Sequence, residues 1–457
     1  MDSNNKDLKE KLSEIDFNNV EICLNVIFVG HVDAGKSTLC GRLLVDLGLI
    51  EERVLEKYKK DAAECNRTSW YLSWCMDLNP EEREKGKTQE ISLCSFNLPT
   101  SEELYKKGNE EKVKDLVTNP KGEIKYVKVN VVDSPGHKSF VGEMIDGAAR
   151  ADVGVLIVSA RTGEFESGFV KGGQTKEHLR LLKASGVTQV FVLVNKMDEC
   201  EWSEKRYDEI KKKLGVFTKN LFKKELKYLP VSGFTGENVV TGDGESFCSA
   251  LIKMCKELKD ESIKGENKLI LNCLERIKGN NLSYFMKLEQ GKIVKNEEYL
   301  LVNNGNVNSV VITEIKDEED VDVEKQLIND VYRIKIKPEE EVLVGSKIVD
   351  KTLKEYILTS KNILVKAGIY GGGKVICSGY NAIMHMNGTK VGIKVTKIFD
   401  LERKRIKIAR GNERVFMELE LDEYMVFNKI KRDKFSIRDE DLTVGVGEIV
   451  KVINKNK

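Results

Sequence analysis

The chain has 457 residues, which is more than one ordinary hydrophobic core accommodates and predicts two to four domains. Its 75 basic and 74 acidic residues leave a net charge of +1, which excludes a protein that attracts nucleic acid through its overall charge. The 10 scattered cysteines lack the spacing of a zinc site and fit a reducing compartment. No signal peptide or membrane span is recognisable, so we expect a cytoplasmic protein.

The elements expected along the chain form two patterns. After a short solvated tail at residues 1–20, strands and helices alternate, which predicts a doubly wound, mostly parallel α/β domain at residues 21–259. Beyond a polar linker, short β-rich segments with Asn/Gly turns predict two antiparallel β-barrels, at residues 260–350 and 351–457. The expected strands of the first domain are Cys23–Val29, Tyr126–Val132, Val153–Val158 and Gln189–Val194, and its expected helices are Lys36–Leu47 and Gln174–Ser185.

A glycine-rich loop lies between the first expected strand and helix, which is the setting that a phosphate-binding loop requires. Its backbone N–H groups and the helix N-terminus would hold phosphates, Lys36 would reach the β and γ phosphates, and the Ser37 hydroxyl would bind Mg²⁺. The residues of this loop are Gly30, His31, Val32, Asp33, Ala34, Gly35, Lys36, Ser37 and Thr38.

A second motif, Asp133-Ser134-Pro135-Gly136, directly follows the second of these strands. Asp133 is placed to hold Mg²⁺ through a water molecule. Gly136 offers its N–H to the γ-phosphate without an obstructing side chain.

A third motif, Asn195-Lys196-Met197-Asp198, predicts the choice of base. Guanine presents two parallel donors that the Asp198 carboxylate can accept, whereas adenine would leave that carboxylate unpaired. Asn195 would brace the loop, and the Lys196 stem would lie on the ring. The backbone N–H groups of Ser232, Gly233 and Phe234 would complete the pocket.

Two further residues are candidates for the switch and the reaction. Thr88 would coordinate Mg²⁺ only when a γ-phosphate is present, although its segment also reads as an ordinary charged loop. His137, next to Gly136, would orient the attacking water, and the alternative is a surface histidine. With Lys36 they form the predicted catalytic set of a GTPase that uses GTP, GDP and Mg²⁺.

These motifs resemble those of the translational GTPases of the elongation-factor type, from about Glu21 to Val452. Finer features are similar to the GTPase subunit of the eukaryotic polypeptide release factor: Ser69–Trp74, Glu82–Thr88, Gly163–Phe169, Lys171–Thr175, Ile376–Ala382 and Phe435–Glu440. The resemblance implies ribosome-stimulated GTP hydrolysis in translation termination. It also implies binding of the stop-codon-reading release factor through the second and third domains, as a monomer or heterodimer that uses neither a membrane nor a specific DNA.

The sequence departs from that family in several places. Only a short tail precedes the first domain, where the family carries a long extension. Pro99–Lys125 reads as a charged insertion and is expected to form a surface loop. Lys278–Ser283 lacks the usual Gly-Thr pair, and Asp433-Lys434 replaces Gly-Arg. Lys87 replaces an apolar residue that would oppose Val32, so it is expected to meet a phosphate instead.

Other functions remain open on the sequence. A ribosome-rescue GTPase and an aminoacyl-tRNA carrier share the main motifs, although the stretch Lys85-Gly86-Lys87-Thr88 argues against both. A GTPase subunit of a sulfate-activating enzyme is a further alternative, because its GTPase region is similar. A nucleotide-gated scaffold without turnover is disfavoured by Thr88, Asp133 and His137.

Overall fold

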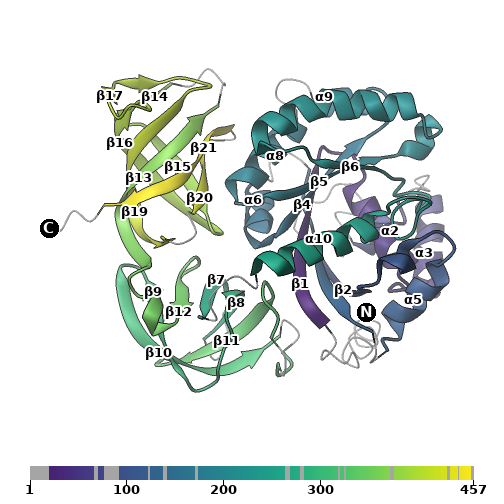
Figure 1. Ribbon diagram of the computed structural model, residues 1–457, viewed down its shortest axis with the longest axis horizontal. Helices are drawn as coiled ribbons and strands as arrows, with labels where there is room; N and C mark the ends of the chain where they lie inside the picture. Colours follow the sequence, from purple (N-terminus) through teal and green to yellow (C-terminus); the bar gives the residue numbers. More distant parts are fainter. Residues whose placement is uncertain are drawn as a thin grey trace. The chain divides into compact units, whose positions relative to one another are not determined.

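The computed structural model divides the chain into two compact units, one holding an α/β sheet and the other holding two β-barrels from Gly265 onward (Figure 1). It describes residues 20–65, 70–76, 92–121, 124–136, 141–169, 173–262, 268–277, 282–317, 320–323, 326–370, 375–429, 433–440 and 442–453.

The first unit is built on a six-stranded sheet with the order β2-β3-β1-β4-β5-β6. All neighbours are parallel except β2, which runs antiparallel to β3. The carboxyl ends of the five parallel strands therefore meet at one edge of the sheet, where ligands bind in such folds. The strands are β1 (Val20–Gly30), β2 (Ser92–Pro99), β3 (Tyr126–Asp133), β4 (Val153–Ser159), β5 (Gln189–Asn195) and β6 (Lys227–Pro230).

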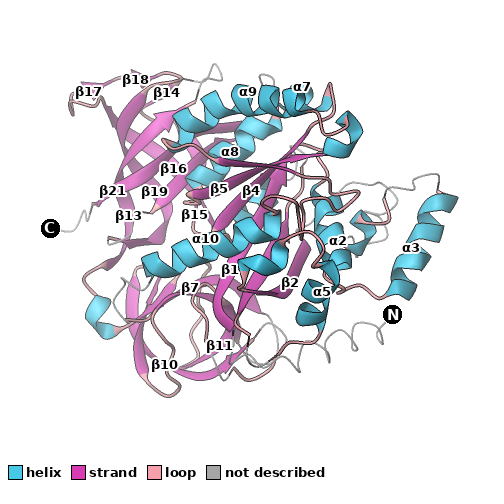
Figure 2. Cartoon of the chain, turned by 45° about the vertical axis from the view of Figure 1, so that its right-hand side comes forward, coloured by secondary structure: helices cyan, strands magenta, loops and turns pink. Residues whose placement is uncertain are grey.

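Both faces of this sheet are covered (Figure 2). On β1, Val26 and Phe28 enter a core shared with α2 and α10, while the alternate residue Ile27 is equally buried. Burial on both faces explains why the strands read as continuous apolar runs. The helices and helical turns are α2 (Lys36–Asp46), α3 (Glu52–Glu64), η2 (Ser73–Cys75), η3 (Glu102–Tyr105), α5 (Glu110–Thr118), α6 (Val141–Arg150), α7 (Glu164–Phe169), α8 (Gln174–Ala184), η5 (Met197–Cys200), α9 (Glu204–Phe222) and α10 (Phe247–Ser262).

The expectation of a surface loop at Pro99–Lys125 is wrong. The segment forms η3 and α5, and its side chains Tyr105 and Val113 are buried in the same core as the sheet. Tyr105 also donates its hydroxyl to the carbonyl of Pro99, at 2.7 Å. The charged residues that suggested a loop lie on the exposed side of a short amphipathic helix.

The second unit begins with a closed six-stranded barrel, ordered β10-β11-β8-β7-β12-β9. Its neighbouring strands are antiparallel, and its interior is filled by residues such as Tyr284, Met286 and Tyr332. The strands are β7 (Ile270–Ile277), β8 (Ser283–Gln290), β9 (Glu298–Asn303), β10 (Asn306–Lys316), β11 (Val331–Lys337) and β12 (Lys347–Val349).

The second barrel follows a short turn, η6 (Lys351–Leu353). Its sheet runs β15-β20-β21-β13-β19-β16-β17, and pairing between β15 and β16 closes the ring. The predicted fold class, an α/β domain followed by two antiparallel barrels, is thus confirmed. The strands are β13 (Ile357–Ile369), β14 (Ile376–Cys377), β15 (Asn381–Met386), β16 (Thr389–Phe399), β17 (Arg405–Ile406), β18 (Ile408–Ala409), β19 (Arg414–Asn428), β20 (Lys434–Asp439) and β21 (Leu442–Val452).

Candidate nucleotide site

The loop between β1 and α2 surrounds a buried lysine. The Lys36 ammonium donates to the carbonyl oxygens of Gly30 and His31, at 3.2 and 3.1 Å. Burial lowers the pKa of Lys36, and the nearby Asp133 carboxylate opposes that shift. A cation with few neutralising neighbours at the start of a helix is suited to an anionic ligand such as a phosphate.

Two glycines allow the loop to pack closely. Gly35 has φ of +88°, and a side chain there would place its Cβ 2.4 Å from Nδ2 of Asn195. A Cβ on Gly136 would lie 2.6 Å from the Lys36 ammonium nitrogen. The structure therefore brings the second motif directly against the phosphate loop.

Ser37 and Asp133 form the oxygen-rich part of the site. The Ser37 hydroxyl donates to the Asp133 carboxylate at 2.5 Å, although the two residues are 96 positions apart. The neighbouring Ser134 hydroxyl anchors the β3 end by donating to the carbonyl of Phe28, at 2.6 Å. A hydroxyl next to a carboxylate provides the hard oxygen ligands that Mg²⁺ prefers, so these residues fit that ion.

Asn195 connects the phosphate loop to the predicted base pocket. Its side-chain nitrogen donates to the carbonyl of Ala34 at 3.0 Å, and its oxygen accepts the N–H of Gly233 at 2.8 Å. One amide side chain therefore holds together two loops that are far apart in the sequence. The predicted bracing role of Asn195 corresponds to these two hydrogen bonds.

Asp198 and Lys196 occupy the rest of this loop. One carboxylate oxygen of Asp198 is buried and has no hydrogen-bond partner among the described residues. A buried acceptor without a partner is costly, and the paired donors of guanine would satisfy it. Lys196 has φ of +63° and pairs with Glu164 of α7, at 2.8 Å.

The loop after β6 is fixed from α2 by a residue that the sequence analysis missed. Arg42 donates to the carbonyl of Gly233 at 3.4 Å and also to that of Phe234, and it pairs with Asp46 at 3.2 Å. Burial raises the pKa of Asp46, whereas Arg42 opposes the shift. The i,i+4 spacing of Arg42 and Asp46 was a visible signal of their pairing. The contact between Arg42 and Gly233, which are 191 residues apart, had no such signal in the sequence.

A second missed residue is His178, which lies on α8. Its Nδ1 accepts the N–H of Gly30 at 3.1 Å, and burial lowers its pKa to about 3. Gln174, one helical turn earlier, lies 3.0 Å from the ring nitrogen of His31. Gln174 and His178 are four residues apart on a predicted helix, a spacing that places both side chains on one face of it. In the structure this face of α8 contacts the phosphate loop.

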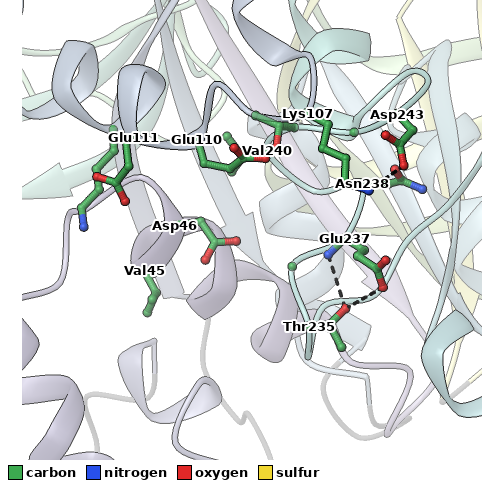
Figure 3. Close-up of a pocket in the computed structure, with 14 residues that line it drawn as sticks. Val45, Asp46, Lys107, Glu110, Glu111, Thr235, Glu237, Asn238, Val240 and Asp243 are labelled. Atoms are coloured by element: carbon green, nitrogen blue, oxygen red, sulfur yellow. Dashed lines mark hydrogen bonds and ion pairs between the residues drawn. The ribbon is translucent and has the colours of Figure 1, made fainter.

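The folded 99–125 segment borders a cavity of about 420 Å³, which is also lined by residues 235–243 of the loop after β6 (Figure 3). Backbone hydrogen bonds join Tyr105 and Lys107 to Gly242, and Glu110 accepts from the Thr241 hydroxyl at 2.7 Å. The 99–125 segment therefore contacts the far end of the loop that begins with Ser232 and Gly233 of the predicted base pocket.

The remaining predicted residues are distributed as follows. Ser232 is fully buried, and Phe234 is exposed. Val32, Asp33 and Thr38 lie in the β1–α2 connection and the first turn of α2. Thr88, His137 and Lys87 lie outside the described residues. Residues 278–281 and residues 430–432, which precede Asp433, also lie outside them.

The stretch Phe435–Glu440 belongs mostly to strand β20 of the second barrel. Phe435 and Ile437 are buried in its core, and the adjoining Asp433 carboxylate accepts the N–H of Asn428 at 2.7 Å. Asp439 accepts from the Tyr380 hydroxyl, which joins the two stretches that resembled the release-factor family. In the described residues no helix is long and apolar enough to cross a membrane.

The parallel sheet, its buried loop lysine and the joined second and third motifs define a nucleotide-binding protein of the phosphate-loop class. Residues 21–278 match the model of the elongation factor Tu GTP-binding domain, and residues 358–453 match that of the elongation factor Tu C-terminal domain. The chain therefore belongs to the elongation factor Tu family of GTP-binding proteins.

Curated relatives refine this likeness. The chain is 31% identical over 453 residues to the eukaryotic peptide chain release factor GTP-binding subunit of Schizosaccharomyces pombe, covering 94% of this chain and 64% of the relative. It is 30% identical to the protein of that name from Candida albicans, covering 94% of this chain and 59% of the relative. The chain thus spans about three fifths of the length of these relatives.

A solved structure supports the fold alone. The Ski7 GTPase-like domain of S. cerevisiae, bound to GTP, superimposes with a TM-score of 0.72 at 17% identity, over 95% of this chain and 98% of that one.

Proposed function

We propose that the chain is a GTP-hydrolysing factor of translation termination that binds the stop-codon-reading release factor and promotes its action on the ribosome. The observation that carries the proposal is the likeness to release factor GTP-binding subunits across 94% of the chain. The joined phosphate and base loops support it, because they provide the nucleotide pocket that such a factor needs.

In this proposal the roles of Lys36, Ser37, Asp133, Asn195 and Asp198 are supported by their geometry, and the roles of Thr88 and His137 are supported by the sequence motifs alone. Lys36 and the N–H groups of the β1–α2 loop hold the phosphates, while Asp198 and Asn195 hold guanine. Ser37 and Asp133 would hold Mg²⁺, which would neutralise charge on the phosphoryl group. Thr88 orders its segment around the triphosphate, and His137 orients the attacking water.

The barrels form the partner surface in this proposal, with domains at 21–259, 260–350 and 351–457. GTP favours the state that binds the release factor, and ribosome-stimulated hydrolysis to GDP and phosphate ends that interaction. Binding energy for the partner is thereby coupled to the identity of the nucleotide.

Binding of the purified stop-codon-reading factor, measured by calorimetry with GTP and with GDP, tests this function. The proposal predicts binding that GTP strengthens and that Lys36→Ala removes. Preferential capture of a ribosome-rescue factor or of aminoacyl-tRNA would overturn it in favour of the related carriers. Adenylyl transfer from ATP to sulfate would indicate the sulfate-activating class.

His137→Ala separates catalysis from binding. The variant is expected to lose ribosome-stimulated hydrolysis while retaining affinity for GTP. A parallel loss of GTP affinity would show that His137 has a structural role instead.

A further inference from the structure

The second barrel carries an exposed basic segment at residues 400–414, between β16 and β19, here called the basic arm. It contains the short strands β17 and β18, which lie together with β14 at one end of the barrel (Figure 2). Six cationic side chains are exposed along it: Arg403, Lys404, Arg405, Lys407, Arg410 and Arg414. The near-neutral net charge of +1 conceals this local concentration.

The acidic side chains of the arm form hydrogen bonds and an ion pair within the arm. The Asp400 carboxylate accepts the N–H groups of Glu402 and Lys404, both at 2.9 Å. Glu402 pairs with Lys404 at 2.9 Å, and Glu413 accepts the backbone N–H of Arg410 at 2.8 Å. These carboxylates are therefore engaged in fixing the arm's conformation.

The other cations are available to a partner. Within the described part of the chain, four of the arm's cations form no ion pair and no side-chain hydrogen bond. They are Arg405, Lys407, Arg410 and Arg414. Residues 400–414 hold six cations and three carboxylates, so the arm keeps a surplus of positive charge. An exposed surplus of one sign along a segment attracts a polyanion.

The arm presents these charges on an ordered backbone. Ile406 pairs with Ile398 of β16, and Ala409 pairs with Ile376 of β14. The Arg403 guanidinium lies 3.8 Å from the ring centre of Phe416, a residue that is only 9% exposed. A preordered surface loses less entropy on binding than a disordered basic tail would.

The composition of the arm selects among polyanions. Its guanidinium groups suit phosphates, which they contact through two parallel hydrogen bonds. Single-stranded nucleic acid is bound on exposed aromatic rings, but the only large apolar side chains exposed on the arm are Leu401 and Ile408. An arm with exposed cations but no exposed aromatic rings fits double-helical RNA, which proteins recognise by its phosphates and its shape.

We propose that the basic arm docks on the phosphate backbone of double-helical RNA. The choice of RNA over DNA rests on the proposed function, which places the chain at the ribosome. The docking itself goes beyond that function, because it assigns a nucleic-acid surface to a part of the second barrel that is separate from the Phe435–Glu440 stretch.

Binding of a fluorescent RNA hairpin with a double-helical stem, titrated at several salt concentrations, tests the arm. In the triple variant Arg405→Gln, Lys407→Gln, Arg410→Gln, affinity at low salt should fall about tenfold or more. The slope of log affinity against log salt should shrink by about one for each cation removed. The matched control removes three exposed lysines of α9 by Lys205→Gln, Lys211→Gln and Lys212→Gln, and should leave binding unchanged.

Several results would overturn the proposal: equal losses in the arm and control variants, tighter binding of single-stranded RNA or duplex DNA, or binding only to vesicles containing phosphatidylserine. Calorimetry with GTP and with the stop-codon-reading factor separates the two proposals. An unmodified chain that binds the factor but not the hairpin refutes the arm alone. One that binds the hairpin but not the factor refutes the termination function alone.

Discussion

The phosphate side and the base side of the nucleotide site are built in different ways. The phosphate side is a contiguous loop, Gly30–Thr38, whose buried Lys36 is held by carbonyl groups of the same loop. The base side is assembled from distant segments, with Asn195 and Arg42 fixing the loop at Gly233. The comparison teaches that most groups proposed to contact the phosphates lie in one contiguous loop, whereas the proposed base pocket also depends on Arg42, which lies outside any motif.

The largest effect is expected on the phosphate side. Lys36→Ala removes the buried cation that is proposed to bind the phosphates, and GTP affinity should fall about a hundredfold or more. Equilibrium binding of a fluorescent GTP analogue measures the loss, and a thermal melt checks that the variant is folded. A folded Lys36→Ala variant with unchanged affinity would show that the phosphates bind elsewhere.

A base-side substitution should change selectivity. Asp198→Asn places an amide donor where guanine presents its own amino group, so GTP affinity should fall about ten- to a hundredfold. Xanthosine triphosphate, which carries an oxygen at that ring position, should bind better to the variant than to the unmodified chain. Competition binding with the two nucleotides measures both changes. Equal losses for both would contradict direct contact between Asp198 and the base.

A smaller effect is expected from the residue that supports the base loop. Arg42→Ala removes the hydrogen bonds to Gly233 and Phe234, and GDP should dissociate about three- to tenfold faster. Stopped-flow displacement of a fluorescent GDP analogue measures this rate. Arg53→Ala, a substitution of an exposed arginine in α3, is the matched control and should leave the rate unchanged. A slower release in Arg42→Ala would refute the support role.

The last effect concerns stability and its dependence on pH. Burial lowers the pKa of His178 to about 3 in the folded chain, from an ordinary 6.5, so the folded state binds fewer protons than the unfolded state. Its contribution to stability is therefore complete above about pH 6.5 and is lost as the pH falls toward 3, by at most about 1.4 kcal/mol per pH unit.

Urea denaturation at several pH values between about 5 and 7 measures this dependence. The variant His178→Asn keeps an acceptor for the Gly30 N–H and removes the titrating ring. Its free energy of unfolding should vary less with pH than that of the unmodified chain. Identical pH profiles would contradict a neutral, buried His178.

Much of the fold was predictable because its signals are local. The expected strand Gln189–Val194 and helix Gln174–Ser185 differ from β5 and α8 by one residue at one end. The 99–125 segment was wrongly predicted to be a surface loop, because its many charged residues drew attention away from a short apolar pattern. Val113, Leu116 and Val117 have helical spacing, and all three are buried.

The motifs of the site were also predictable, but their connections were not. The third motif marked Asn195, yet no pattern showed that its side chain would join Ala34 to Gly233. The same holds for His178 and Gly30, which meet across 148 residues. Such contacts depend on tertiary packing, which a linear motif does not encode.

Titration calorimetry of the full chain with GTP, GDP and ATP, in the presence of Mg²⁺, tests the central claim most directly. A pocket formed by Lys36, Asp133 and Asp198 predicts heat of binding for both guanine nucleotides and none for ATP at the same concentrations. Equal binding of ATP, or no binding of either guanine nucleotide, would contradict the account.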